Sequence, residues 1–175
     1  MEARTLPEVI VTAGGLELQL AEADIGEHGP LLHRQFNRIL AAGEGYPQAG
    51  PISYDEFRDY WVDGKTSVVA AWASGDGAFV GSYHLKPNGY GRAAHVANGG
   101  YFVVPEWRGK GAGQALVRHS MGWAQTLGFD ALQFNFVFES NPARSLYERL
   151  GFQQVGRVPE VIDGEAVYIY WRRLP

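Results

Sequence analysis

The chain has 175 residues, a length that suits one domain with a hydrophobic core of its own. Its formal net charge of −4 and its globular composition argue against nucleic acid or a membrane surface as the main partner. The sequence contains no cysteine, which excludes disulfides, thiolate metal sites and a cysteine nucleophile and fits a cytoplasmic protein.

Strands and helices alternate along most of the sequence. After a loose N-terminal arm over residues 1–15, periodicity and turn residues predict, in order, a strand at 16–20, helices at 30–42 and 53–62, strands at 66–73, 78–85 and 94–104, a helix at 111–127, a strand at 131–138, a helix from 142, and strands at 152–158 and 166–171. Ser53 and Glu56 have the spacing of a capping box, which supports the second helix. The whole chain, residues 1–175, is therefore predicted to be one α/β domain, in which about four helices flank a mixed sheet of about seven strands.

A glycine-rich turn joins the fourth strand to the helix at 111–127. Pro105 ends the strand, because proline cannot donate to a sheet ladder. The turn contains Arg108, Gly109, Lys110, Gly111, Ala112 and Gly113. Glycines let backbone N–H groups face a ligand at the N-terminus of a helix, and the two basic side chains add positive charge. The pattern predicts a phosphate site; the alternative is a turn whose glycines are there for steric reasons alone.

Two segments resemble the GNAT superfamily of N-acetyltransferases. Residues 103–116 are similar to its acetyl-CoA signature, whose core is Arg/Gln-x-x-Gly-x-Gly/Ala, and residues 141–152 are similar to its closing helix, which ends in Leu-Gly-Phe. The resemblance implies a GNAT-like sheet splayed between its fourth and fifth strands, with acetyl-CoA as acyl donor in the opening. The cofactor would pair there with the backbone of Phe102, Val103 and Val104. Gly99 and Gly100 fit such a close approach, or else a bulge or bend in the strand.

Acetyl transfer to an amine requires a neutral amine and a proton or hydrogen bond for the departing sulfur. By resemblance, Tyr147 stands where the family often has a tyrosine general acid, although a tyrosine also packs helices against sheets. Asn141 would contact pantetheine by resemblance, and a helix-capping role explains it equally well. Many relatives have a glutamate near the position of Asn98. This chain has no carboxylate there; His95 could act as a base and Glu139 could act through water, but we expect no dedicated base.

The run from Phe134 to Asn141 resembles a fungal branch of the family that acetylates proline analogues such as azetidine-2-carboxylate. By that resemblance, Asn98 and Asn135 contact the acceptor; the alternative is that backbone groups at the splay satisfy both amides.

The predicted function is transfer of an acetyl group from acetyl-CoA to a small amino-acid-like amine, by direct attack in a ternary complex. A protein or peptide amine and a non-catalytic acyl-CoA-binding module are the alternatives. The expected partner is a small-molecule amine, with no nucleic acid and no membrane, and a homodimer is left open. No histidines have metal-ligand spacing, so we expect no metal.

Overall fold

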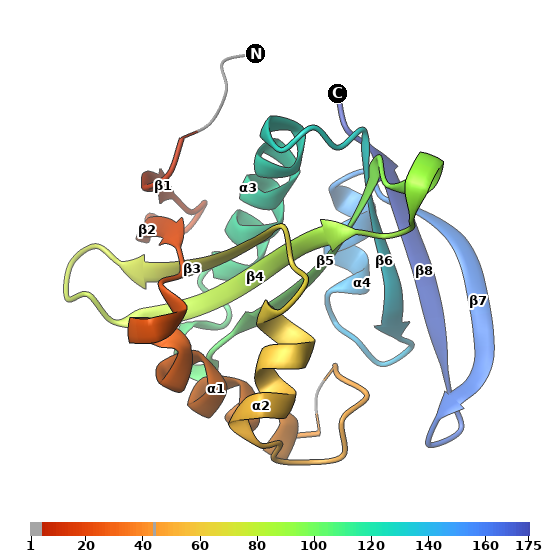
Figure 1. Cartoon of the computed structure of the whole chain (residues 1–175), viewed down its shortest axis with the longest axis horizontal. Helices are drawn as coiled ribbons and strands as arrows, with labels where there is room; N and C mark the ends of the chain where they lie inside the picture. The colour runs from red at the N-terminus through yellow and green to blue at the C-terminus, as the bar shows by residue number, and fades with distance from the viewer. Residues whose placement is uncertain (1–4, 44) are drawn as a thin grey trace.

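Eight strands form one mixed sheet in the order β1-β2-β3-β4-β5-β6-β8-β7 (Figure 1). The computed structural model describes residues 5–43 and 45–175, so residues 1–4 of the predicted arm lie outside the described residues. The strands are β1 (Glu8–Val11), β2 (Glu17–Glu22), β3 (Ser67–Ala73), β4 (Phe79–Pro87), β5 (Val96–Val103), β6 (Ala131–Phe138), β7 (Gln153–Ile162) and β8 (Glu165–Arg173). Neighbouring strands are antiparallel except β5 and β6, which are parallel.

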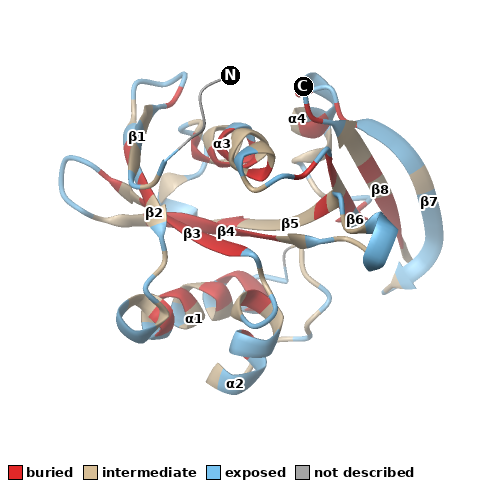
Figure 2. Cartoon of the chain, turned by 45° about the horizontal axis from the view of Figure 1, so that its top comes forward, coloured by how far each residue is buried: buried red, intermediate tan, exposed pale blue. Residues whose placement is uncertain are grey.

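The helices lie on both faces of this sheet. They are α1 (Ile25–Ala41), α2 (Tyr54–Phe57) with its π-helical continuation η1 (Arg58–Val62), α3 (Ala112–Thr126), α4 (Arg144–Arg149), and the 3₁₀ turns η2 (Gly91–Ala93) and η3 (Pro105–Trp107). Figure 2 shows α1 and α2 on one face, and α3 and α4 on the other. Each face has its own core cluster, one around Phe36 and Trp61 and the other around Leu116 and Leu132. No helix in the described part of the chain is long and apolar enough to cross a membrane.

The sheet has one strand more than the seven predicted. This additional strand is β1, which forms within the predicted loose arm. It pairs with β2 along its whole length. Its outward residues, Val9 and Val11, are exposed, whereas Glu8 points inward and lies 3.3 Å from Nε2 of His119, a buried residue of α3. β1 has only four residues and one of its two inward residues is acidic, so it lacks the apolar alternation from which a strand is predicted.

α1 begins at Ile25, five residues before the predicted start at Pro30. Asp24 caps it by accepting a hydrogen bond from the Glu27 amide at 3.2 Å. The predicted capping box of α2 is confirmed, because Ser53 Oγ accepts from the Glu56 amide and the Glu56 carboxylate accepts from the Ser53 amide. The two caps fix where α1 and α2 begin, and both helices lie over one face of the sheet (Figure 2).

The ladder between β5 and β6 is short. Three residue pairs form it, and the last joins Asn98 to Gln133. Beyond that pair the two strands separate, which confirms the predicted splay (Figure 1). β6 is then supported by β8 alone, with a register shift between Phe134 and Val137 that leaves Asn135 and Phe136 exposed. One edge of β5 is thus available beside an opening that reaches the interior.

Candidate active site

A cavity of about 640 Å³ lies where β5 and β6 separate. It is lined by both strands, the first turns of α3, α4 with the turn before it, and the loop after α1. Among the predicted site residues, those that line it are Asn98, Phe102, Val103, Arg108, Gly113, Asn135, Asn141 and Tyr147. Residues far apart in the sequence, on four elements, are therefore brought to one site.

The glycine-rich turn has the geometry of an anion site. Gly109 and Gly111 have φ of 72° and 82°, in the left-handed region that other residues avoid. Among the described residues, no side chain caps the amides of the first turn of α3. Those N–H groups and the helix dipole favour an anion, and Lys110 lies nearby with its Nζ 4.5 Å from the centre of the Trp107 ring. The turn therefore fits the diphosphate of a coenzyme.

Along β5, the backbone groups of alternate residues point toward the opening, and those of the residues between them point toward β4. The Val104 amide donates to the Val80 carbonyl on β4, and a Cβ on Gly81 would stand 2.4 Å from the Phe102 carbonyl oxygen. Both backbones are thus directed toward β4. The Tyr101 and Val103 carbonyls point the other way, where they accept from Tyr46 Oη and Arg108 Nε. Of the three residues expected to pair with the cofactor, only Val103 offers its backbone to the opening, and Tyr101 joins it.

Gly99 and Gly100 lie in an unbroken stretch of the β4–β5 ladder, without the bulge that glycines in a strand can indicate. A Cβ on Gly100 would stand 2.7 Å from Cε1 of His84, and one on Gly99 would stand 2.8 Å from Tyr101 Oη. The two glycines therefore make room for neighbouring rings, one on each face of the sheet.

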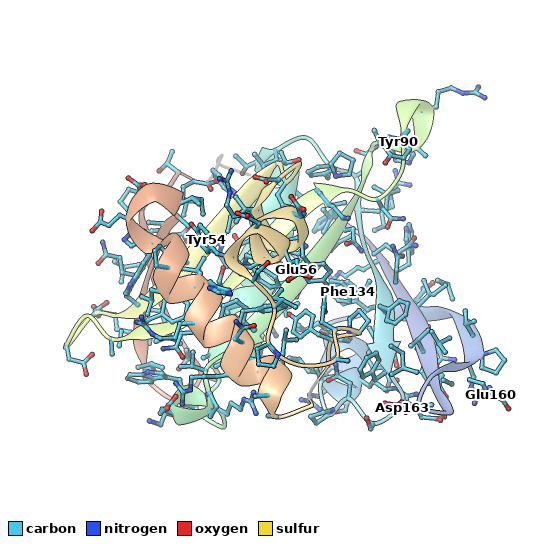
Figure 3. All side chains as sticks on the ribbon, turned by 60° about the horizontal axis from the view of Figure 1, so that its bottom comes forward. Tyr54, Glu56, Tyr90, Phe134, Glu160 and Asp163 are labelled. Atoms are coloured by element: carbon cyan, nitrogen blue, oxygen red, sulfur yellow. The ribbon has the colours of Figure 1, made fainter. Side chains whose placement is uncertain are left out.

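Tyr147 lies on α4 at the inner wall of the cavity. Its ring centre is 4.7 Å from that of Phe134, which projects from β6 into the interior (Figure 3). Burial, and to a lesser extent the charge of Tyr170, raise the pKa of the Tyr147 hydroxyl above its ordinary value. Within the described residues, no protein group hydrogen-bonds to this hydroxyl. It is therefore a protonated donor without a partner, at the cavity wall.

The three predicted asparagines all have protein partners. Asn98 Nδ2 donates to the Gln133 carbonyl at 3.0 Å and bridges the strands where they separate. Asn135 Nδ2 donates to Asn88 Oδ1 at 2.6 Å. Asn141 Oδ1 accepts from the Ala143 amide at 2.9 Å, just ahead of α4. Only the bond of Asn98 agrees with its structural alternative, because Asn135 bonds a side chain rather than the backbone and the N-cap of α4 is Ala143. Oδ1 of Asn98 and Nδ2 of Asn141 are left for a ligand.

The two candidate bases lie outside the cavity. His95 is exposed, and its Nδ1 lies 2.8 Å from the Arg92 carbonyl oxygen. The Glu139 carboxylate accepts from the Tyr168 hydroxyl at 2.8 Å and lies 3.7 Å from Arg157. Neither residue is among those that line the cavity, so the structure does not bring either of them to the site as a base.

Four charged or titratable residues that the sequence did not single out for the site line the end of the cavity beside α2. They are Asp59, Lys65, His84 and Lys86. His84 and Lys86 are two residues apart on β4 and so share a face, which is the signal that could have found them. Burial, and then the charges of Lys65 and Lys86, lower the pKa of His84 to about 3. His84 is therefore neutral at pH 7.

The splayed α/β sheet, the uncapped helix beside it and the protonated tyrosine define an acyltransferase site. The chain belongs to the acetyltransferase (GNAT) family, whose model matches residues 34–152. Membership confirms the enzyme class that the sequence predicts, an N-acetyltransferase with acetyl-CoA as acyl donor. Within the described residues, no group of three or more histidine or acidic side chains could hold a metal ion.

Known proteins resemble the chain over most of its length. N-acetyltransferase aca1 of Schizosaccharomyces pombe is 32% identical over 150 residues, which are 76% of this chain and 72% of that protein. A GCN5-related N-acetyltransferase from Kribbella flavida is 32% identical with a TM-score of 0.81, over 90% of this chain and 98% of the other. A phosphinothricin acetyltransferase from Sinorhizobium meliloti, solved in complex with acetyl-CoA, shares the fold at 21% identity, with a TM-score of 0.75 over 90% of this chain and 88% of the other.

The lowered pKa of His84 predicts a loss of stability in acid. Above pH 6.5 the residue is neutral whether the chain is folded or unfolded, but between 6.5 and about 3 only the unfolded chain takes up the proton. The free energy of unfolding should therefore decrease as the pH is lowered from 6.5 to about 3. His84→Gln should make this decrease smaller. Urea denaturation of both proteins at several pH values measures it. Parallel curves would contradict the prediction.

Proposed function

We propose that this enzyme transfers an acetyl group from acetyl-CoA to the amine of a small amino-acid-like acceptor, with both substrates bound together. The observation that carries the proposal is that the loop after α1 lines the cavity and is bonded to β5. Tyr46 Oη in that loop donates to the Tyr101 carbonyl on β5, and a Cβ on Gly45 would stand 3.9 Å from Asn141 Nδ2. A loop held against β5 in this way narrows the space for an acceptor, which favours a small molecule over a peptide chain that needs an open groove.

The donor side of the site suits coenzyme A. The first amides of α3, with Arg108 and Lys110, would hold its diphosphate. The backbone of Val103 and Nδ2 of Asn141 would bond its pantetheine amides. When bound, acetyl-CoA supplies an acyl group that is already activated as a thioester.

Tyr147 is assigned the role of general acid. Burial keeps its hydroxyl protonated, so it can give a proton to the leaving sulfur as the new bond to nitrogen forms, and regain one from solvent. Oδ1 of Asn98 would accept a hydrogen bond from the acceptor amine, and the amide of Asn135 would contact the acceptor farther out. No dedicated base is required if the amine reaches the site neutral, with water taking up its proton.

The acceptor class is tested with an acetyl-CoA thiol-release assay on purified protein. The panel contains free amino acids, cyclic secondary amino acids, simple amines and peptides of ten or more residues. We expect release with amino acids and none above background with the peptides. Release with peptides alone would replace the small acceptor by a protein amine, and tight coenzyme A binding without any release would indicate a binding module.

Gly113→Asp tests the diphosphate site. Its Cβ would meet only Val103 Cγ2, at 3.9 Å, so the substitution fits sterically. An acidic side chain in the first turn of a helix interacts favourably with the helix dipole, but it repels an anion bound at the same place. Coenzyme A should bind roughly ten-fold more weakly to Gly113→Asp than to its neutral counterpart Gly113→Asn, on the scale of one lost charge-assisted bond. Calorimetric titration measures this, and equal affinities would contradict the site.

Tyr147→Phe tests the acid. It should lower kcat about 100-fold, in the range for loss of a positioned proton donor, and leave coenzyme A affinity unchanged. Tyr170→Phe is the matched control, since that buried hydroxyl bonds Glu148 and Arg144 and lies outside the cavity lining. If both variants kept the same kcat, Tyr147 would be a packing residue only.

A further inference from the structure

The cavity end beside α2 concentrates positive charge. Lys65 follows η1, and Lys86 lies near the end of β4, two residues after His84. All three residues line the cavity, and both lysines are partly buried. The two ammonium groups are close enough for Lys86 to lower the pKa of Lys65, after the larger effect of burial.

The described carboxylates nearest these positive charges form no salt bridge with them, although the charges of Asp63 and Asp59 partly offset the lowering of the Lys65 pKa. Among the described residues, no carboxylate oxygen lies within 4 Å of either ammonium group. Lys65 Nζ donates to the main-chain carbonyl of Asp63 at 2.9 Å, and the Asp63 carboxylate is itself bound by Arg58 at 3.2 Å. Two like charges beside one cavity repel each other, and Asp59 is the one carboxylate among its described lining residues. An anionic ligand would relieve the remaining repulsion.

The histidine between them is a second, independent observation. His84 is 5% exposed, and its Nδ1 has no hydrogen-bond partner within the described residues. Its ring packs edge-on against Trp61 and lies over Gly100. A buried ring nitrogen rarely stays unpaired in a native protein, and this one is enclosed, so a ligand could bond to it only if the ring turned toward the cavity that it lines.

The cluster of Lys65, Lys86 and His84 lies beside Asn98, the residue proposed to bond the acceptor amine. Lys86 is opposite Asn98 in the β4–β5 register, and His84 is opposite Gly100. A group held by the lysines would therefore lie next to Oδ1 of Asn98 and next to the edge where the acyl group would stand. An amino acid carries its amine and its carboxylate on one carbon, so the two could be held at these neighbouring positions together.

We propose that Lys65, Lys86 and His84 form an anion site in the acceptor pocket, and that the enzyme selects acceptors carrying a carboxylate. The inference rests on the proposed function, because it names the acceptor group that the same site recognises. The lysines supply charge, and the neutral His84 ring supplies one directed hydrogen bond to a carboxylate oxygen.

The test compares matched acceptors that differ only in this group, each amino acid against its carboxamide. The wild-type enzyme should have a kcat/KM at least about ten-fold higher for the acid, the scale of one hydrogen bond to a charged group. Lys86→Met should abolish most of that preference by raising KM for the acid, whereas Lys86→Arg should retain it. Arg92→Gln is the matched control, since it removes an exposed cation on η2 outside the cavity lining.

A binding measurement separates this inference from the proposed function. N-acetyl amino acids and their amides are titrated into the enzyme with coenzyme A present, in wild type and Lys86→Met. Selective binding of the acid without any turnover would support the anion site and overturn the proposed acetylation. Turnover with equal use of acid and amide, or an unchanged preference in Lys86→Met, would overturn the anion site. If neither binding preference nor turnover is found, both fail.

Discussion

The site depends on the early end of one hydrogen-bonded ladder. β5 and β6 pair over three residues and then part, so the β5 backbone groups beyond Asn98 that face away from β4 must find partners other than a strand. Asn98 closes the ladder by donating across to the Gln133 carbonyl. Tyr46 and Arg108 bond the carbonyls of Tyr101 and Val103 along the open edge. A ligand with its own amides could pair with this edge as an additional strand would.

Charge is distributed along the cavity in a definite order. The chain is acidic overall, with a formal net charge of −4, yet it has three lysines and all stand at this site or at its phosphate turn. Lys110 belongs to the turn, whereas Lys65 and Lys86 lie at the opposite end. Tyr147, at the cavity wall, is kept neutral by burial. A cavity that is positive at both ends, with the protonated Tyr147 hydroxyl at its wall, suits two substrates that each carry a negative charge far from the reacting groups.

Local patterns predicted the elements well and the site in part. The strand at 131–138 and the Ser53 capping box depend on neighbouring residues alone, and both formed as predicted. Which residues turn their backbones to the opening depends on the register with β4, a long-range property. The predicted set therefore combines Val103, which faces the opening, with two residues that face the other way. Lys65 lines the cavity because η1 packs beside β4, where Trp61 contacts His84, and no local spacing reveals this packing.

The first strand has a role out of proportion to its four residues. Glu8 in β1 contacts His119 on α3, and the turn after β1 abuts the phosphate turn, where a Cβ on Gly111 would stand 3.3 Å from Cβ of Thr12. β1 therefore braces the helix whose N-terminus would receive the coenzyme. Removal of the chain through Glu8 would delete the contact with α3 beside the phosphate turn, although no residue of β1 lines the cavity.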